Sequence, residues 1–253
     1  MADHIRAFWC RVPSRPNVGD ALTPWLIHRL TGIYPRFVWP DSPAHKYLVT
    51  GSIAALARRS STVWGAGILC SDDHISPDAT LLAVRGPLTR ARARATGARS
   101  PMVLGDPAMI LPRLYAPPAP PPEGIGLALH FSDRPRLAPL RVSERVRVID
   151  MQWPVEVAID AIRSCELVAS SSLHGIIIAH AYGVPATWVE FTPLPSGDGS
   201  KFRDHLQCIG SDRDQPLRLD LRQIDEGQLW MHAVSPPEAF DVDALWQSCP
   251  FTL

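Results

Sequence analysis

The stretch ELVASSSLHGIIIAHAYGVPATWVEF, residues 166–191, contains a strand, a helix and a strand in direct succession. ELVASSS predicts a strand, and LHGIIIAHAYG predicts an apolar helix that ends at Gly183. PATWVEF predicts the next strand. A strand–helix–strand unit of this kind joins parallel strands, so the stretch places the chain in the α/β class.

The same alternation continues on the amino-terminal side of this unit. Apolar runs that predict strands are IRAFW (5–9), KYLVTGS (46–52), TVWGAG (62–67), TLLAV (80–84), PMVLG (101–105), GIGLALHF (124–131) and RVRVID (145–150). Runs with helix-like spacing are GDALTPWLIHRLTG (19–32), IAALARR (53–59), GPLTRARARATG (86–97) and VEVAIDAIRSC (155–165), with KFRDHLQCIG (201–210) and DVDALWQSC (241–249) beyond the unit. This order predicts doubly wound parallel sheets and not a sandwich or a helical bundle.

One low-complexity stretch, APPAPPPEG at residues 116–124, divides the chain. Proline fixes φ and donates no backbone hydrogen bond, so the stretch predicts an extended connector, or hinge. We therefore expect a Rossmann-like lobe at residues 1–115 and a second one at residues 125–253, whose terminal helix can pack back on either lobe. Such folds bind ligands at the carboxyl ends of their strands, which here predicts a site in the cleft between the lobes.

The composition excludes several classes of protein. Among 253 residues, 25 Lys and Arg balance 25 Asp and Glu, which argues against binding nucleic acid or anionic lipid by bulk charge. Hydrophobic residues make up 46%, too many for a disordered chain, and no apolar run approaches the roughly 18 residues of a membrane span. The first residues lack the apolar segment of a secretory signal. The five cysteines contain no CxxC pair, which indicates reduced thiols and no zinc site. We expect a cytoplasmic protein.

Two predicted helix starts carry features that bind anions. Asn17 and Gly19 precede Asp20 at the first helix, where glycine lets a ligand approach backbone amides, although Asp20 can equally be a plain cap. Arg85 ends a strand just before Gly86 opens another helix. A guanidinium beside a helix start predicts an oxyanion site that opens to the cleft.

Further polar side chains follow predicted strands. Asp106 precedes a proline that holds it extended, so it either projects its carboxylate from the sheet or forms a turn. His130 ends the run GIGLALH and is expected to face the same cleft. The sequence WGAG at residues 64–67 lacks the third glycine of a dinucleotide fingerprint, because Cys70 stands at that position, and it therefore predicts a tight turn and not an NAD site.

The segment SSSLHG at residues 170–175 is the most informative. Hydroxyls end a strand, and His174 enters the first turn of an apolar helix, where the positive helix end disfavours an imidazolium. An anionic ligand reverses that effect, so His174 is expected to gain proton affinity when substrate binds. No G-x-S-x-G elbow occurs, which argues against a serine hydrolase. His180, deeper in the same helix, is expected to be a hydrogen-bonded core residue.

Lys201 is one of two lysines among the 25 basic residues, the other being Lys46. It begins the short amphipathic helix KFRDHLQCIG, where its charge opposes the helix dipole. A residue that breaks a local rule is typical of a functional position, so we expect Lys201 to bind an anion. The alternative is a surface lysine whose stem covers apolar groups.

Six motifs, in order, are similar to those of the polysaccharide pyruvyl transferases, in particular the bacterial exopolysaccharide and succinoglycan branch. They are NVGDALTPWLIHRLTG, VWGAG, VRGPLT, LGDPAMILP, SSSLHGIIIAHAYGVPA and KFRDHLQCIG, which together run from Asn17 to Gly210. The resemblance implies a fold similar to the GT-B glycosyltransferases. It also implies transfer of pyruvate from phosphoenolpyruvate onto two hydroxyls of a sugar, as a ketal. Some relatives carry an arginine where Ser172 stands, so the resemblance leaves open which cation binds the donor.

Roles for individual residues follow from the resemblance and the local patterns together. His174 is expected to protonate the methylene carbon of the donor, and Asp20 or Asp106 to take the proton of a sugar hydroxyl. The residues expected to bind substrate are Asn17, Gly19, Arg85, Gly86, His130, Ser171, Ser172, Leu173 and Lys201. No metal or cofactor is required, because protonation activates the donor. The expected partners are phosphoenolpyruvate and a sugar of an exopolysaccharide or of its lipid-linked precursor, with attachment to the inner face of the cytoplasmic membrane left open.

Two other functions stay open at this point. A GT-B glycosyltransferase that uses a nucleotide sugar would need a carboxylate for the ribose hydroxyls, and Glu190, after the run PATWV, can serve. A non-catalytic subunit of a polysaccharide-assembly complex would bind the ligand without releasing phosphate.

Overall fold

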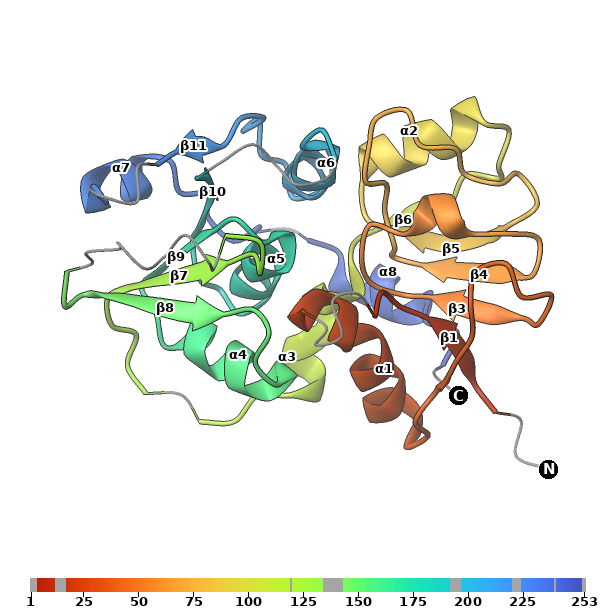
Figure 1. Ribbon diagram of the computed structural model, residues 1–253, viewed down its shortest axis with the longest axis horizontal. Helices are drawn as coiled ribbons and strands as arrows, with labels where there is room; N and C mark the ends of the chain where they lie inside the picture. The colour runs from red at the N-terminus through yellow and green to blue at the C-terminus, as the bar shows by residue number, and fades with distance from the viewer. Residues whose placement is uncertain are drawn as a thin grey trace.

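Two parallel β-sheets form the framework of the protein (Figure 1). The computed structural model describes residues 4–11, 17–118, 120–133, 143–191, 197–219, 224–238 and 240–251. Within these residues one sheet has six strands and the other five, and the strand pairs of both are parallel. The predicted α/β class is therefore confirmed, with two parallel-sheet regions.

The first sheet has the strand order β2-β1-β3-β4-β5-β6. Its strands are β1 (Arg6–Phe8), β2 (Arg36–Phe37), β3 (Lys46–Leu48), β4 (Ser61–Trp64), β5 (Thr80–Val84) and β6 (Val103–Leu104). Each apolar run of the first half overlaps one of these strands, and the run TLLAV matches the bounds of β5. The edge strand β2 was not predicted, because two residues are too few to show a period.

The helices of the first half are α1 (Val18–Thr31), η1 (Ala54–Leu56), α2 (Pro87–Ala95), η2 (Pro107–Ile110) and α3 (Leu111–Leu114). Asn17 caps the start of α1, and Gly32, with φ of 72°, ends it. The helix predicted at residues 53–59 is wrong. Only one 3₁₀ turn forms there, because the chain becomes extended at Ala57, with φ −64° and ψ 144°.

The second sheet has the strand order β11-β10-β9-β7-β8. Its strands are β7 (Ile125–Leu129), β8 (Val146–Asp150), β9 (Leu167–Ser170), β10 (Ala186–Glu190) and β11 (Leu217–Arg218). The helices after β8 are α4 (Val155–Arg163), α5 (Leu173–Ala181), α6 (Ser200–Cys208), α7 (Glu226–Met231) and α8 (Val242–Gln247). Helix α5 is buried along almost its whole length, which explains why its sequence is apolar on all sides.

His180 on α5 is the hydrogen-bonded core residue that the sequence predicts. It is 3% exposed, its Nδ1 shares a hydrogen bond of 3.0 Å with Nε2 of His205, and its Nε2 donates to the carbonyl of Val234 at 3.1 Å. Burial lowers the pKa of His180 to about 4, so the ring is neutral at pH 7.

The proline-rich connector forms no helix or strand at its described positions, residue 119 lying outside them. Arg163 donates to the carbonyl of Pro117 at 2.6 Å, and the amide of Glu123 donates to the carbonyl of Ser164 at 2.9 Å. Both bonds tie the connector to the carboxyl end of α4. The division of the chain at this connector stays a prediction.

One apolar core spans both halves. It joins Leu22 and Leu26 of α1, Trp64 of β4 and Ile110 of η2 to Ile159 of α4, Ile176 of α5 and Phe202 of α6. The amide of Val18 also donates to the carbonyl of Met151 at 2.7 Å, and Trp25 donates to Glu156 at 3.2 Å, so α1 is fixed to the second half. The halves are therefore held against each other by packing.

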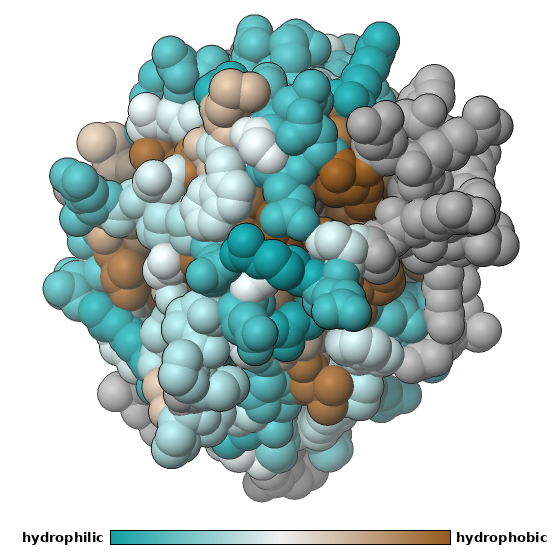
Figure 2. Space-filling model, turned by 90° about the vertical axis from the view of Figure 1, so that its left-hand side faces the viewer, coloured by the Kyte–Doolittle hydropathy of each residue, from teal (hydrophilic) through white to brown (hydrophobic). Residues whose placement is uncertain are grey.

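The face of the protein shown in Figure 2 is mostly polar where its residues are described. On this face, apolar residues are scattered among hydrophilic ones. In the part of the chain that the structure describes, no helix combines the length and apolar composition needed to cross a membrane.

The terminal helix α8 packs on the first half. The indole of the fully buried Trp64 donates to the carbonyl of Leu245 at 3.3 Å and to Oγ of Ser248 at 3.1 Å. Phe251 packs edge-on against Trp64 and Tyr47, with ring centroids 5.9 and 4.7 Å apart. The chain thus returns to its first sheet after completing the second.

Leu245→Ala tests the contribution of this helix. Leu245 is completely buried, so its truncation should lower the free energy of unfolding by about 2–5 kcal/mol. Val157→Ala, at a half-exposed position on α4, is the control and should cost less than about 0.5 kcal/mol. Urea unfolding measures both, and equal effects for the two variants would show that α8 adds no stability.

Candidate active site

His174 faces Asp106 across the junction of the two halves. His174 lies on the first turn of α5, directly after β9, and Asp106 follows β6 at the start of η2. Nε2 of the ring is 3.4 Å from Oδ2 of the carboxylate. Both atoms are buried and neither has a hydrogen-bond partner among the described residues. The other carboxylate oxygen of Asp106 accepts from the amide of Ala108 at 2.9 Å, which fixes the group in place.

Gly19 lies against the other side of the imidazole. A Cβ built at Gly19 would lie 2.1 Å from Nδ1 of His174, far inside van der Waals contact. The sequence predicted that this glycine admits a ligand to backbone amides, but the group that occupies the space beside it is His174. Glycine is required here because α1 and α5 approach each other closely.

Asp20 follows on the same turn of α1. Its carboxylate accepts from the side-chain amide of Asn17 at 2.6 Å, and its backbone amide donates to Oδ1 of Asn17 at 3.2 Å. Asn17 is thus the cap of α1, and its amide also orients Asp20. Burial raises the pKa of Asp20 to about 6, and the nearby charges of His174 and Lys201 hold the rise to that value.

Lys201 lies on the first turn of α6. Burial, followed by the charge of Arg85, lowers the pKa of its ammonium to about 8. The charges of Asp20 and Asp133 oppose this decrease. The ammonium lies 5.3 Å from the ring centroid of Phe202, and among the described residues it has no hydrogen bond or ion pair. It is therefore a half-buried cation with neighbouring carboxylates but without a direct partner.

Arg85 does not face an open cleft, and this prediction is wrong. Its side chain is completely buried and donates to Asp204 at 3.1 Å, to Ser52 at 3.0 Å and to the carbonyl of Ile68 at 2.6 Å. The helix start at Gly86 is also not open to a ligand, because the amide of Thr89 donates to the carboxylate of Asp204 at 3.0 Å. The sequence predicted that a bound oxyanion occupies this place. The group that occupies it is the carboxylate of Asp204.

The residues that surround His130 form a small polar cluster, comprising Ser132, Asp133 and Ser171. Ser171 donates to Oδ2 of Asp133 at 2.6 Å and accepts from the amide of His130 at 3.0 Å. Nδ1 of His130 lies 2.7 Å from Oγ of Ser132. Burial, followed by the charge of Lys201, lowers the pKa of His130 to about 4, so this ring is neutral at pH 7.

The start of α5 has no side-chain cap, although Ser172 occupies the cap position. Ser172 is 5% exposed, and its amide donates to Ser170 at 3.0 Å. The side chain of Leu173 belongs to the shared apolar core. Of the predicted pair Leu173-His174, the leucine can therefore offer a ligand only its backbone amide at the helix start.

Sequence reasoning missed two acidic residues. Asp133 is 6% exposed beside Ser171, and Asp204 is completely buried beside Arg85. Asp204 belongs to a run that was assigned only as a helix, and Asp133 lies between the assigned runs. Each finds its partner at least 38 positions away. The position of Asp204 three residues after Lys201 on one helix was the only local signal.

Potential metal ligands gather at one described place, where atoms of Cys70, Asp72 and Asp73 lie within 4.8 Å of one another. The carboxylate of Asp73 accepts from the amides of Leu69 at 2.7 Å and of Cys70 at 3.3 Å. It therefore holds the turn in which it lies.

Carboxylates, an imidazole and an ammonium thus lie near one another where strands of the two parallel sheets end, the place where α/β folds bind their ligands. A family model described as polysaccharide pyruvyl transferase matches residues 36–191. The match spans more than half of the chain, so the protein belongs to the polysaccharide pyruvyl transferase family. His174 and Asp106 lie within the matched residues, whereas Asp20 and Lys201 lie outside them.

Two individual proteins are similar to the chain. An uncharacterized protein of Acanthamoeba polyphaga mimivirus is 36% identical over 211 residues, which cover 79% of this chain and 73% of the relative. A crystal structure of a functionally uncharacterized protein from Klebsiella pneumoniae subsp. pneumoniae aligns with a TM-score of 0.48 and 11% identity, covering 85% of this chain and 92% of that one.

Asp20→Asn tests the burial of this carboxyl through the pH dependence of stability. The folded pKa of about 6 lies above the unfolded value of about 3.9, so the carboxyl favours the folded state at low pH and loses that contribution as the pH rises through 6. The asparagine variant cannot ionise. It should exceed the wild type in unfolding free energy by about 1–2 kcal/mol at pH 7.5, and the difference should shrink towards zero at pH 4.

Urea unfolding at the two pH values measures this difference. The same substitution at the exposed Asp78 is the control for the loss of a surface charge. A difference that is equal at both pH values, or that grows on acidification, would contradict the burial of an ionised Asp20.

Proposed function

We propose that the protein transfers pyruvate from phosphoenolpyruvate onto two hydroxyls of a sugar, forming a ketal. The observation that carries the proposal is the contact of His174 with Asp106, beside a protonatable Asp20 and a Lys201 that has no direct partner in the described part of the chain. This set offers a proton donor, a fixed cation and a base to one small acidic molecule. Membership in the pyruvyl transferase family supports the same reaction.

Phosphoenolpyruvate carries a carboxylate and a phosphate, and its binding site must supply positive charge. Lys201 is the cation available for it, because Arg85 is already paired with Asp204. The uncapped start of α5 adds backbone amides at the positive end of the helix dipole. His130, which is neutral at pH 7, can add a hydrogen bond but no charge.

The first chemical step is the transfer of a proton from His174 to the methylene carbon of the donor. The neighbouring carbon, which bears the phosphate, then gains oxocarbenium character, and a methyl group has formed. Asp106 is a positioning residue, since its buried carboxylate faces Nε2 of the imidazole and holds the orientation of the ring. The contact of 3.4 Å is longer than a hydrogen bond, and contacts of this kind commonly tighten when substrate binds.

The second step is attack by a sugar hydroxyl on the oxocarbenium carbon. Asp20 accepts the hydroxyl proton, and a pKa of about 6 lets it act as a base and release the proton near neutral pH. The bond to phosphate breaks and a second hydroxyl closes the ketal. One hydroxyl proton replaces the proton lost by His174, and the other leaves on the phosphate, so the products are the ketal and inorganic phosphate.

His174→Gln removes the acid while filling similar space. A positioned general acid contributes about 10²–10⁴-fold, so kcat for phosphate release should fall on that scale. His232→Gln, at the end of α7, is the control and should leave kcat unchanged. Phosphate release from phosphoenolpyruvate, assayed with a panel of hexose glycosides, measures both, and a near-normal rate in the His174 variant would remove this residue from the mechanism.

Lys201→Met tests the donor-binding cation. Loss of a charged hydrogen bond to the donor should raise KM for phosphoenolpyruvate by about 10- to 100-fold. The other lysine is a natural contrast, because Lys46 donates to the carbonyls of Ser42 at 2.6 Å and Ala44 at 3.2 Å. Lys46→Met should lower the melting temperature and leave KM unchanged. Equal KM values for phosphoenolpyruvate in the wild type, Lys201→Met and Lys46→Met would show that Lys201 does not bind the donor.

A further inference from the structure

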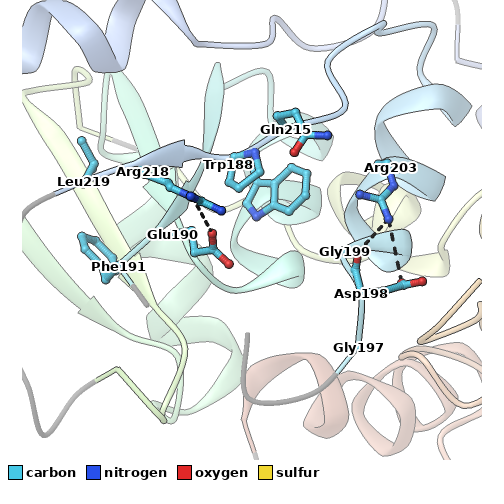
Figure 3. A pocket seen from close by; sticks show the side chains of 11 residues that line it. Trp188, Glu190, Phe191, Gly197, Asp198, Gly199, Arg203, Gln215, Arg218 and Leu219 are labelled. Carbon is cyan, nitrogen blue, oxygen red and sulfur yellow. Dashed lines mark hydrogen bonds and ion pairs between the residues drawn. The ribbon is translucent and has the colours of Figure 1, made fainter. Parts of the chain in front are cut away.

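A pocket lies one strand away from His174, at the carboxyl end of β10. It has a volume of about 510 Å³, and Trp188, Glu190, Gly199, Arg203, Gln215 and Arg218 are among the residues that line it (Figure 3). Neither His174 nor Lys201 is part of its described lining. The mechanism above makes no use of this pocket.

Trp188 is one of the apolar residues that line the pocket, with Phe191 and Leu219. One face of the indole stacks on Phe202, with ring centroids 4.5 Å apart and planes within 10°. The residue is 6% exposed, and its Nε1 has no hydrogen-bond partner among the described residues. Tyr and Trp side chains usually pair their polar atom when buried, so this N–H is a donor that lacks its acceptor.

The charges that line the pocket cancel one another. Nε of Arg218 lies 3.3 Å from Oε2 of Glu190, and Arg203 lies 3.9 Å from Oδ1 of Asp198. Figure 3 shows these two pairs on opposite sides of the indole. Within its described lining, an anion would therefore find no uncompensated cation. A neutral ligand rich in hydroxyl groups fits better, because a carboxylate has about four acceptor sites and the contact with Arg218 uses one.

The pocket and the proposed donor site share one helix start. Phe202, on which Trp188 stacks, directly follows Lys201 on α6. A Cβ at Gly199, the cap residue of α6, would lie 3.1 Å from the indole of Trp188. Trp188 also pairs in register with Ser170, the last residue of β9, which leads into His174. A molecule in the pocket therefore lies beside the residues that handle the donor.

We propose that this pocket is the subsite for the acceptor sugar. A hexopyranose ring packs its C–H groups against Trp188, one ring hydroxyl accepts from the indole N–H, and others donate to Glu190 and Gln215. This inference rests on the proposed pyruvyl transfer, for which the sugar must present two hydroxyls to the donor. Apolar contact combined with a few placed polar groups is the general pattern of small-ligand sites.

Glu190→Gln tests the subsite while preserving the shape of the pocket. Glu166→Gln is the matched control, because Glu166 also accepts from an exposed arginine, Arg145, at 2.8 Å, but lies at the opposite end of the sheet strands. In the wild type and both variants, saturation-transfer NMR measures binding of methyl β-D-galactopyranoside and methyl β-D-glucopyranoside. Steady-state assays with the glycoside that is turned over measure KM for the acceptor and for phosphoenolpyruvate separately.

We expect Glu190→Gln to weaken glycoside binding and raise the acceptor KM by about tenfold, with KM for phosphoenolpyruvate within twofold of the wild type. Glu166→Gln should match the wild type in every measurement. Trp188→Phe, which keeps the stacking on Phe202 and removes the N–H, should also weaken glycoside binding.

Other outcomes overturn the inference in distinct ways. Unchanged glycoside binding and acceptor KM in Glu190→Gln would remove the acceptor from this pocket. A rise in KM for phosphoenolpyruvate alone would assign the pocket to the donor. Binding of uridine diphosphate that is lost in Glu190→Gln would make it a nucleotide pocket. Absence of phosphate release from the wild type with every glycoside would instead refute the proposed function, and the NMR comparison would still decide whether the pocket binds sugars.

Discussion

The buried carboxylate of Asp204 joins the two halves of the protein where the site depends on both. It belongs to α6 and accepts hydrogen bonds from Arg85 and Thr89 of the first half. Arg85 and Asp204 are both completely buried, so losing either partner would leave a desolvated charge uncompensated. The backbone segments of the two halves approach so closely here that a Cβ at Gly86 would lie 2.0 Å from the backbone oxygen of Asp204. Since Lys201 is one turn earlier on α6, this contact also positions the backbone of Lys201.

Neither half contains a complete set of reactive groups. The first half contributes the carboxylates of Asp20 and Asp106, and the second contributes the imidazole of His174 and the ammonium of Lys201. Burial at the junction acts on acids and bases in opposite directions, raising the pKa of Asp20 to about 6 and lowering that of Lys201 to about 8. Both values move towards neutrality, the range in which proton transfer in either direction is cheapest. Packing the two halves together therefore prepares the groups for chemistry as well as positioning them.

Local sequence patterns predicted the elements well and the contacts between them poorly. The alternation of strands and helices follows from periodicity, and the position of His174 at a helix start follows from the boundary between SSS and an apolar run. The buried partner of Arg85 does not, because Asp204 is 119 positions away and only the folded chain brings the two together. A glycine shows the same limit. The sequence marks Gly19 as a place of close approach, but what approaches it is His174 and not a ligand. A pattern thus shows that space is needed without showing what fills it.

The electrostatic contrast between the surroundings of Lys201 and the pocket at Trp188 gives the strongest reason to assign them different ligands. Among the described residues the positive charge of Lys201 has no direct partner, whereas the two arginines that line the pocket at Trp188 are each matched by a carboxylate. A small dianion gains most from the first environment, and a neutral polyol gains most from the second, since hydroxyl groups need acceptors and donors but no net charge. Ketal formation requires one molecule of each kind to meet at a single carbon atom. The start of α6, with Lys201 and Phe202 on adjacent positions, borders both environments, and it is the place where such a meeting costs the least movement of either ligand.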